Sequence, residues 1–197
     1  MTTVHSFDER LAYSQAQSDQ PWWDVVYRRA FPDLLATADL RHDGWHQRAG
    51  RDRAIVLSSG RTIYVDEKVR ERDYDDVLLE VWSRYPKSGE PPYPAKRRDG
   101  FDIAGTAAGW ARKPLDCDWL AYAFEQSQVC YLLPFLGVRA ALENQKLGWT
   151  QKATLRADGF RWVEAQNTNY KTISVAVPID VLRTAINNAL TISWGGA

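Results

Sequence analysis

The most regular hydrophobic pattern lies in the middle of the chain, where two apolar runs flank a short polar turn. Residues 54–57 (Ala-Ile-Val-Leu) and 62–65 (Thr-Ile-Tyr-Val) are separated by Ser58-Ser59-Gly60-Arg61. This pattern predicts a β-hairpin with a buried apolar face. We expect that face to contain Ile55, Leu57 and Ile63. A third apolar run, residues 77–82, follows an acidic turn, so the three segments together predict an antiparallel β-meander.

Helical spacing of apolar residues predicts four helices, two near the N-terminus and two in the C-terminal third of the chain. Residues 7–17 predict an N-terminal helix, and Pro21 is placed as a first-turn proline of a second helix that contains Trp22, Val25 and Val26. Residues 137–146 predict another helix. Pro178 is expected to open a final helix through residue 190, with Ile179, Leu182 and Ile186 on one stripe.

The remaining segments predict strands and loops. Residues 119–124, 128–133 and 172–177 predict strands, whereas residues 39–50 are polar and turn-like. Residues 84–100 are rich in proline and predict an inserted loop, and residues 152–167 predict a polar hairpin or an irregular segment. Helices that flank a central mixed sheet with a meander core place the chain in the α+β class. At 197 residues, we expect one domain spanning residues 1–197.

Composition narrows the cellular context. No apolar run approaches the roughly 20 residues that a membrane helix needs, and the polar N-terminus does not resemble a signal peptide. The two cysteines, Cys117 and Cys130, lie in apolar surroundings, which favours buried thiols over a disulfide or a zinc site. We therefore expect a cytoplasmic protein.

The charged residues are balanced overall but unevenly distributed. The net charge is zero, which argues against a broad electrostatic surface for nucleic acid. Basic residues nevertheless gather near the hairpin and in the proline-rich loop. Weak candidates for phosphate contacts are Arg53, Arg70, Lys96, Arg97 and Arg98.

The candidate chemistry lies on the predicted hairpin. Asp52 stands at the entrance of its first strand, and strand alternation places Asp66 and Lys68 on one face of the second strand, with Glu67 on the opposite face. Glu80, on the third apolar run, could add another carboxylate. Such carboxylates can hold a hard divalent cation, while an ammonium can orient water and offset developing negative charge.

This constellation resembles the PD-(D/E)XK nuclease superfamily, in which an acidic residue begins one strand of a hairpin and the next strand carries (Asp/Glu)-x-Lys. The matching residues are Asp52 and Asp66-Glu67-Lys68, preceded by a Gln-x-x-Gly-x-Asp sequence at Gln47, Gly50 and Asp52. Arg51 stands where the family has proline. The resemblance implies a restriction-endonuclease-like fold of the phage or bacterial type. It also implies hydrolysis of DNA phosphodiester bonds with Mg²⁺ or Mn²⁺.

The resemblance assigns Asp52, Asp66 and Glu80 to the metal, Lys68 to the attacking water, and a place in the site to Gln47. Each residue also has a structural interpretation: Asp52 as a turn cap, Asp66 and Lys68 as a cross-strand ion pair, Glu80 as part of a salt bridge. Glu67 is expected to be exposed or paired with an arginine.

Three functions stay open at this point. The first is the nuclease, which could act as a homodimer. The second is a catalytically inactive protein of the same fold that binds nucleic acid or a protein partner. The third is a structural or interaction protein in which the charged strand ends only form ion pairs.

Overall fold

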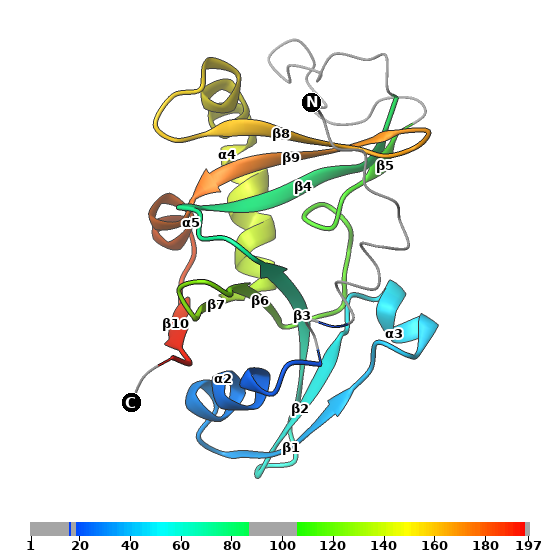
Figure 1. The fold of residues 1–197 in the computed structure, drawn as a ribbon, viewed down its shortest axis with the longest axis vertical. Coiled ribbons are helices and arrows are strands. Elements are labelled where there is room, and N and C mark those ends of the chain that lie inside the picture. The colour runs from blue at the N-terminus through cyan, green and yellow to red at the C-terminus, as the bar shows by residue number, and fades with distance from the viewer. Residues whose placement is uncertain (1–15, 17–18, 87–105, 196–197) are drawn as a thin grey trace. The chain divides into compact units, whose positions relative to one another are not determined.

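A computed structural model of the chain describes residue 16 and residues 19–86 and 106–195 (Figure 1). The described residues divide into two compact units. We name them the six-stranded unit (residues 16, 19–74, 114–137 and 186–195) and the four-stranded unit (residues 75–86, 106–113 and 138–185) after their sheets. The chain passes back and forth between the units. The expectation of one domain over residues 1–197 stays a prediction.

The six-stranded unit contains a mixed sheet with the strand order β1-β2-β3-β6-β7-β10. Its strands are β1 (Leu34–Asp39), β2 (Arg53–Leu57), β3 (Thr62–Arg70), β6 (Trp119–Phe124), β7 (Val129–Pro134) and β10 (Leu190–Ser193). β3 and β6 are parallel, and the other neighbours are antiparallel. The unit also includes the helices α2 (Trp22–Ala30) and α3 (Gly44–Arg48). The predicted α+β class is confirmed.

The central hairpin is confirmed. β2 and β3 pair in antiparallel register, with Ala54 opposite Tyr64 and Ile55 opposite Ile63. Ile55, Leu57 and Ile63 are buried, as their apolar alternation predicts. The meander assignment is wrong, because the third apolar run (now part of β4, Asp76–Tyr85) pairs with β5 and β9 in the other sheet. The strand that completes the meander is instead β1, on the other side of β2.

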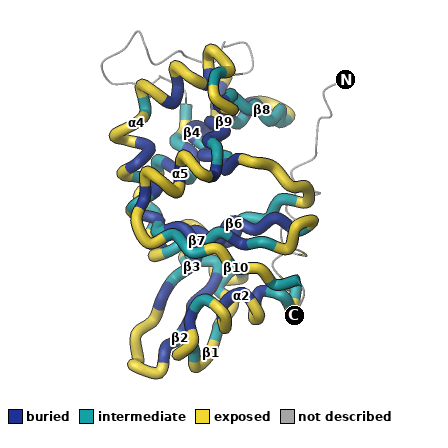
Figure 2. The backbone as a smooth tube through the Cα atoms, turned by 90° about the vertical axis from the view of Figure 1, so that its left-hand side faces the viewer, coloured by how far each residue is buried: buried dark blue, intermediate teal, exposed yellow. Residues whose placement is uncertain are grey.

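The core of the six-stranded unit lies between α2 and one face of the sheet. The helix contributes Trp23, Val26 and Tyr27, and β2 and β3 contribute the buried aliphatic residues of the hairpin. Ala121, Ala123, Cys130 and Leu132 complete this core from β6 and β7. Figure 2 shows this pattern, with buried residues along the strands and exposed residues at the turns that join them. The core therefore fixes which face of β3 points toward α2.

The four-stranded unit contains an antiparallel sheet with the strand order β5-β4-β9-β8. Its further strands are β5 (Ala107–Ala108), β8 (Arg161–Gln166) and β9 (Lys171–Pro178), and its helices are most of α4 (Phe135–Leu155) and all of α5 (Ile179–Ala185). Buried aliphatic residues alternate along β4, whereas β9 is buried without a break from Ile173 to Val177. α5 contacts both of these strands and so packs against the sheet.

Several predicted boundaries need correction. The helix expected at residues 137–146 extends to Leu155, and the segment expected to be irregular forms the end of α4 and strand β8. The final helix ends at Ala185, and Leu190 begins β10. The polar segment 39–50 contains α3, capped by Asp43. The inserted loop was placed at 84–100, but Arg84 and Tyr85 belong to β4.

Two expectations fall wholly or largely outside the described residues: the helix at 7–17 and the rest of the proline-rich loop, with Lys96, Arg97 and Arg98. Both cysteines are buried free thiols, as predicted. No helix in the described part of the chain is long and apolar enough to cross a membrane.

Candidate active site

The hairpin brings Asp52 and Asp66 together. Register pairing sets Arg53 opposite Val65, so one further step along the two antiparallel strands leads to Asp52 and Asp66. The backbone of Asp52 donates to the carbonyl of Val65 at 2.9 Å. Its carboxylate Oδ2 accepts a hydrogen bond from the backbone N–H of Glu67 at 2.8 Å. Asp52 is therefore fixed to β3 through both its main chain and its side chain.

Asp66 is the most deeply buried of these acids, with 4% of its surface exposed. The Lys68 ammonium nitrogen lies 2.7 Å from its Oδ2, on the same strand face. Burial raises the pKa of Asp66 to about 7; the Lys68 charge opposes this rise and the neighbouring Asp52 carboxylate adds to it. The single positive charge of Lys68 thus lies near two carboxylates, so the site carries an excess of negative charge when both acids are ionised.

Glu67 points to the other face of β3, as predicted, but it is buried rather than exposed. Its Oε1 accepts hydrogen bonds from the Tyr27 hydroxyl at 2.7 Å and from Arg53 Nε at 2.6 Å. Burial raises the pKa of Glu67, and the Arg53 charge opposes that rise. The predicted pairing with an arginine is correct. The expectation of an exposed side chain is wrong because α2 covers this face.

The same network involves Arg53, one of the predicted phosphate contacts. Arg53 is buried, with 9% of its surface exposed, and its guanidinium forms the ion pair with Glu67. Arg70 is only half-buried; it donates to the Tyr122 hydroxyl at 3.1 Å and lies 4.0 Å from the centre of the Tyr74 ring. Arg53 would have to leave this ion pair to contact a phosphate, and phosphate contacts stay predictions for both Arg53 and Arg70.

The other candidates are spread over the chain. Gln47 is exposed on α3, and its backbone carbonyl accepts from the N–H of Gly50 at 3.1 Å. Glu80 lies on β4 in the four-stranded unit, where its carboxylate accepts from the backbone N–H of Trp110 at 3.3 Å. Site roles for Gln47 and Glu80 stay predictions.

The donor set fits a magnesium ion better than a zinc ion. Within the described residues, no three His, Cys, Asp or Glu side chains form a group that could hold a metal. Mg²⁺ does not need such a cage, because it keeps several waters and uses one or two carboxylates together with phosphate oxygens. Among the described residues, Oδ2 of Asp66 is buried and accepts no hydrogen bond of regular geometry. Asp52 and Asp66 are therefore suited to hold such a cation.

Two residues near the acids of β3, Cys117 and Tyr27, were not among the predicted site residues. Cys117 is buried near Asp66, Lys68 and Asp52; burial raises the pKa of its thiol, and the two carboxylates add to the rise. The thiol therefore stays protonated and is a poor ligand for a hard cation. Tyr27, from α2, holds Glu67. Neither could be recognised from sequence spacing, since both come from elements distant from the hairpin.

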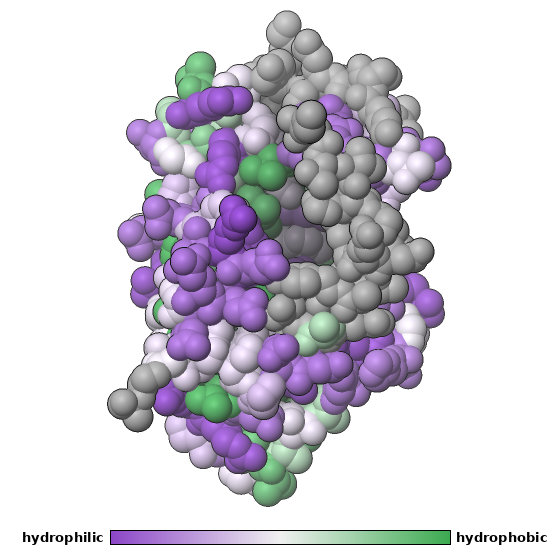
Figure 3. All heavy atoms as spheres, viewed as in Figure 1, coloured by the Kyte–Doolittle hydropathy of each residue, from purple (hydrophilic) through white to green (hydrophobic). Residues whose placement is uncertain are grey.

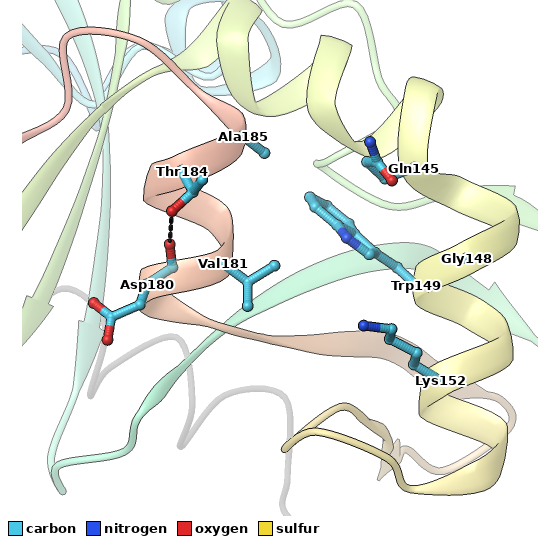
Figure 4. A pocket seen from close by; sticks show the side chains of 8 residues that line it. All are labelled: Gln145, Gly148, Trp149, Lys152, Asp180, Val181, Thr184 and Ala185. Atoms are coloured by element: carbon cyan, nitrogen blue, oxygen red, sulfur yellow. Dashed lines mark hydrogen bonds between the residues drawn. The ribbon is translucent and has the colours of Figure 1, made fainter.

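The four-stranded unit has a groove of its own, between α4 and α5, with a volume of about 560 Å³. Figure 4 shows Trp149 and Lys152 on α4 facing Val181 on α5, while the carboxylate of Asp180 points away from them. On the face of the molecule drawn in Figure 3, hydrophobic side chains are scattered among hydrophilic ones. The groove is lined by one acid, Asp180, and one ammonium, Lys152, and not by the pair of acids that the hairpin site has.

Comparisons with known proteins identify no relative. No family model matches the chain, and no curated protein or solved structure matches it significantly.

Proposed function

We propose that the protein is a metal-dependent nuclease that hydrolyses DNA phosphodiester bonds at the hairpin site. The proposal includes membership of the PD-(D/E)XK superfamily and a restriction-endonuclease-like architecture of phage or bacterial type. The observation that carries it is the placement of Asp52 beside the buried Asp66, with the Lys68 ammonium 2.7 Å from Asp66. These are the residue types that the superfamily motif requires.

Each of the three side chains has a separate role in the proposal. Asp52 and Asp66 hold a divalent cation, Mg²⁺ or Mn²⁺, and thereby orient the scissile phosphate against the strand. When bound, the cation polarises the phosphoryl group and lowers the pKa of water. Lys68 positions the attacking water and offsets the negative charge that develops on the phosphate.

The electrostatics of the site support a cation more than a simple ion pair. Burying a carboxylate costs free energy unless opposite charge compensates it. Lys68 supplies one positive charge for two acids, and the pKa of Asp66 still rises to about 7. A divalent cation would supply the missing charge, and the pKa of Asp66 would then fall.

Cleavage assays test the proposal directly. The purified chain would be incubated with single-stranded, double-stranded and branched DNA in Mg²⁺, in Mn²⁺ and in EDTA. We expect cleavage only with metal, and a loss of about 100-fold or more in Asp52→Asn and Asp66→Asn, because the metal supplies several kcal/mol of stabilisation. Asp33→Asn is the matched control, since Asp33 is exposed and lies in the same unit.

The outcomes separate the alternatives. Metal-dependent cleavage that both variants lose and the control keeps would support the nuclease. DNA binding without cleavage under every condition would favour the inactive nuclease-fold protein. Cleavage that persists in EDTA, or in both Asp→Asn variants, would contradict the assignment of the site.

A further inference from the structure

An exposed tryptophan stands beside the proposed active site. Trp45, on α3, has 57% of its surface exposed, an unusual position for the largest apolar side chain. The guanidinium carbon of Arg51 lies 4.9 Å from the centre of the Trp45 ring and 4.0 Å from the centre of the Tyr64 ring. Arg51 also forms an ion pair with Asp116. We name Trp45, Arg51 and Tyr64 the aromatic platform.

The local backbone holds the platform in place. Asp43 caps α3 and accepts from the backbone N–H groups of Trp45 at 2.8 Å and of His46 at 3.2 Å. Behind the helix, the N–H of Asp116 donates to the carbonyl of Ala49 at 2.7 Å. The His46 ring bridges Trp45 and Tyr64, with ring centres 4.9 Å and 6.3 Å apart. These hydrogen bonds and ring contacts therefore fix the segment that exposes Trp45 to solvent.

The platform lies on the same side of β3 as the candidate chemistry. Strand alternation places Tyr64, Asp66 and Lys68 on one face. Two residues along a strand span about 7 Å, so Tyr64, whose ring lies against Arg51, is about 7 Å along β3 from Asp66. A nucleotide within a few steps of a phosphate at Asp66 could thus reach the Trp45 ring.

We propose that the aromatic platform binds an unpaired nucleobase, so that the substrate is DNA that is single-stranded next to the cleaved bond. This inference rests on the proposed nuclease function and adds its substrate class. An indole face offers stacking to any base, and the arginine on its other side adds positive charge near the phosphate backbone. A base inside a duplex is already stacked on its neighbours and cannot use the ring in this way.

Two properties of the molecule agree with this substrate. Net charge is zero, which argues against a broad basic surface and gives more weight to specific contacts such as base stacking. His46 Nδ1 is buried and has no hydrogen-bond partner within the described part of the chain. A base that stacks beside His46 would bring polar edge atoms next to that ring.

An abasic-site scan tests the inference. Binding of a fluorescein-labelled 20-nucleotide single strand would be measured by anisotropy in the Asp66→Asn background, which keeps the DNA intact. Bases would be removed one at a time along the strand. With Trp45 present, we expect one position at which base removal weakens binding by about 5-fold to 150-fold, the range of single base–aromatic stacks. Trp45→Ala should weaken binding of the intact strand similarly and abolish the sensitivity to base removal.

The controls match the perturbation. Trp45→Phe keeps an aromatic face and should retain most of the affinity, whereas Leu147→Ala removes an apolar side chain of equal exposure (58%) from the four-stranded unit and should change nothing. A duplex of the same sequence should bind more weakly than the single strand and should not respond to Trp45→Ala.

The results distinguish this inference from the proposed function. If the unsubstituted chain cleaves DNA with Mg²⁺ but Trp45→Ala leaves both the affinity and the abasic profile unchanged, the platform is wrong and the nuclease stands. If binding depends on Trp45 and on one base, yet no DNA is cleaved, the nuclease is wrong and the base site stands. A preference for duplex DNA that Trp45→Ala leaves unaltered would overturn the proposed substrate class.

Discussion

The substitution Asp66→Asn should separate two effects of the Asp66 carboxylate: its cost to folding stability and its role in binding a cation. In the metal-free protein, burial and Asp52 hold the pKa of Asp66 at about 7, against 3.8 in an unfolded chain. Asparagine has nearly the same shape and carries no charge at any pH. The variant therefore removes one ionisation from the folded state and leaves the packing of β3 in place.

Proton linkage gives the direction in which the free energy of unfolding changes with pH. Between pH 4 and pH 7 the folded protein binds a proton at Asp66 that the unfolded chain has released, so the free energy of unfolding falls as pH rises through this range. The stabilisation is complete below the unfolded pKa and is lost above the folded one. A rise from 3.8 to about 7 corresponds to about 4 kcal/mol at ~1.4 kcal/mol per pKa unit.

Urea unfolding at pH 4.5, 6 and 8 in EDTA measures this effect. We expect the free energy of unfolding of Asp66→Asn minus that of the unsubstituted protein to be only about 1 kcal/mol at pH 4.5, which lies just above the unfolded pKa of 3.8. At pH 8 the variant should be more stable by up to about 4 kcal/mol. Loss of the partner of Lys68 costs little, because 32% of the Lys68 side chain is exposed.

Magnesium should narrow the difference in stability between the two proteins. At tenfold excess over its dissociation constant, a ligand that binds only the folded state adds about 1.4 kcal/mol. That gain is expected for the unsubstituted protein and for exposed Asp33→Asn, and not for Asp66→Asn. A variant that is less stable than the unsubstituted protein at pH 8 without metal would refute the reasoning, because Asp66 would then be a stabilising ion-pair partner of Lys68.

Three further variants test other parts of the site. Lys68→Ala should lose about 100-fold or more of the cleavage rate yet keep the Mg²⁺-induced rise in thermal stability; loss of both would make Lys68 necessary for metal binding. Glu67→Gln leaves the buried Arg53 without its counter-charge and should lower the free energy of urea unfolding by about 3 kcal/mol, and an unchanged value would contradict the burial of this pair. Gly50→Ala places a Cβ 2.8 Å from Leu115 at a φ of +72° and should cost about 2 kcal/mol or more in the same assay; a silent substitution would contradict this backbone geometry.

Local patterns predicted the hairpin and its acids well. The turn Ser58–Arg61 and the flanking apolar runs set the register, and that register alone brings Asp52 to Asp66. Alternation then placed Glu67 on the opposite face. These features depend on residues within about 20 positions of one another, so the sequence contains the information needed to place them.

Pairing between distant segments was not predictable in the same way. β4 has the apolar pattern of a third meander strand, but its partner is β9, about 100 residues later in the chain. β1 was missed because it is an edge strand whose residues are exposed or only half-buried, so it lacks a clear alternation. Helix α4 continues through Gly148, a residue type of low helix propensity, so its true end at Leu155 is not marked by local sequence.

The burial of Glu67 shows how the core and the candidate site depend on one another. On one face of β3, Glu67 is held by Tyr27 and Arg53 beneath α2. On the other face, Asp66 and Lys68 form the site. The backbone N–H of Glu67 joins the two, because it donates to the carboxylate of Asp52. The position of that N–H fixes the orientation of Asp52, and the buried network fixes the strand that carries it. A strand held this firmly can keep two like-charged acids close together, which an exposed hairpin could not do without a cation already bound.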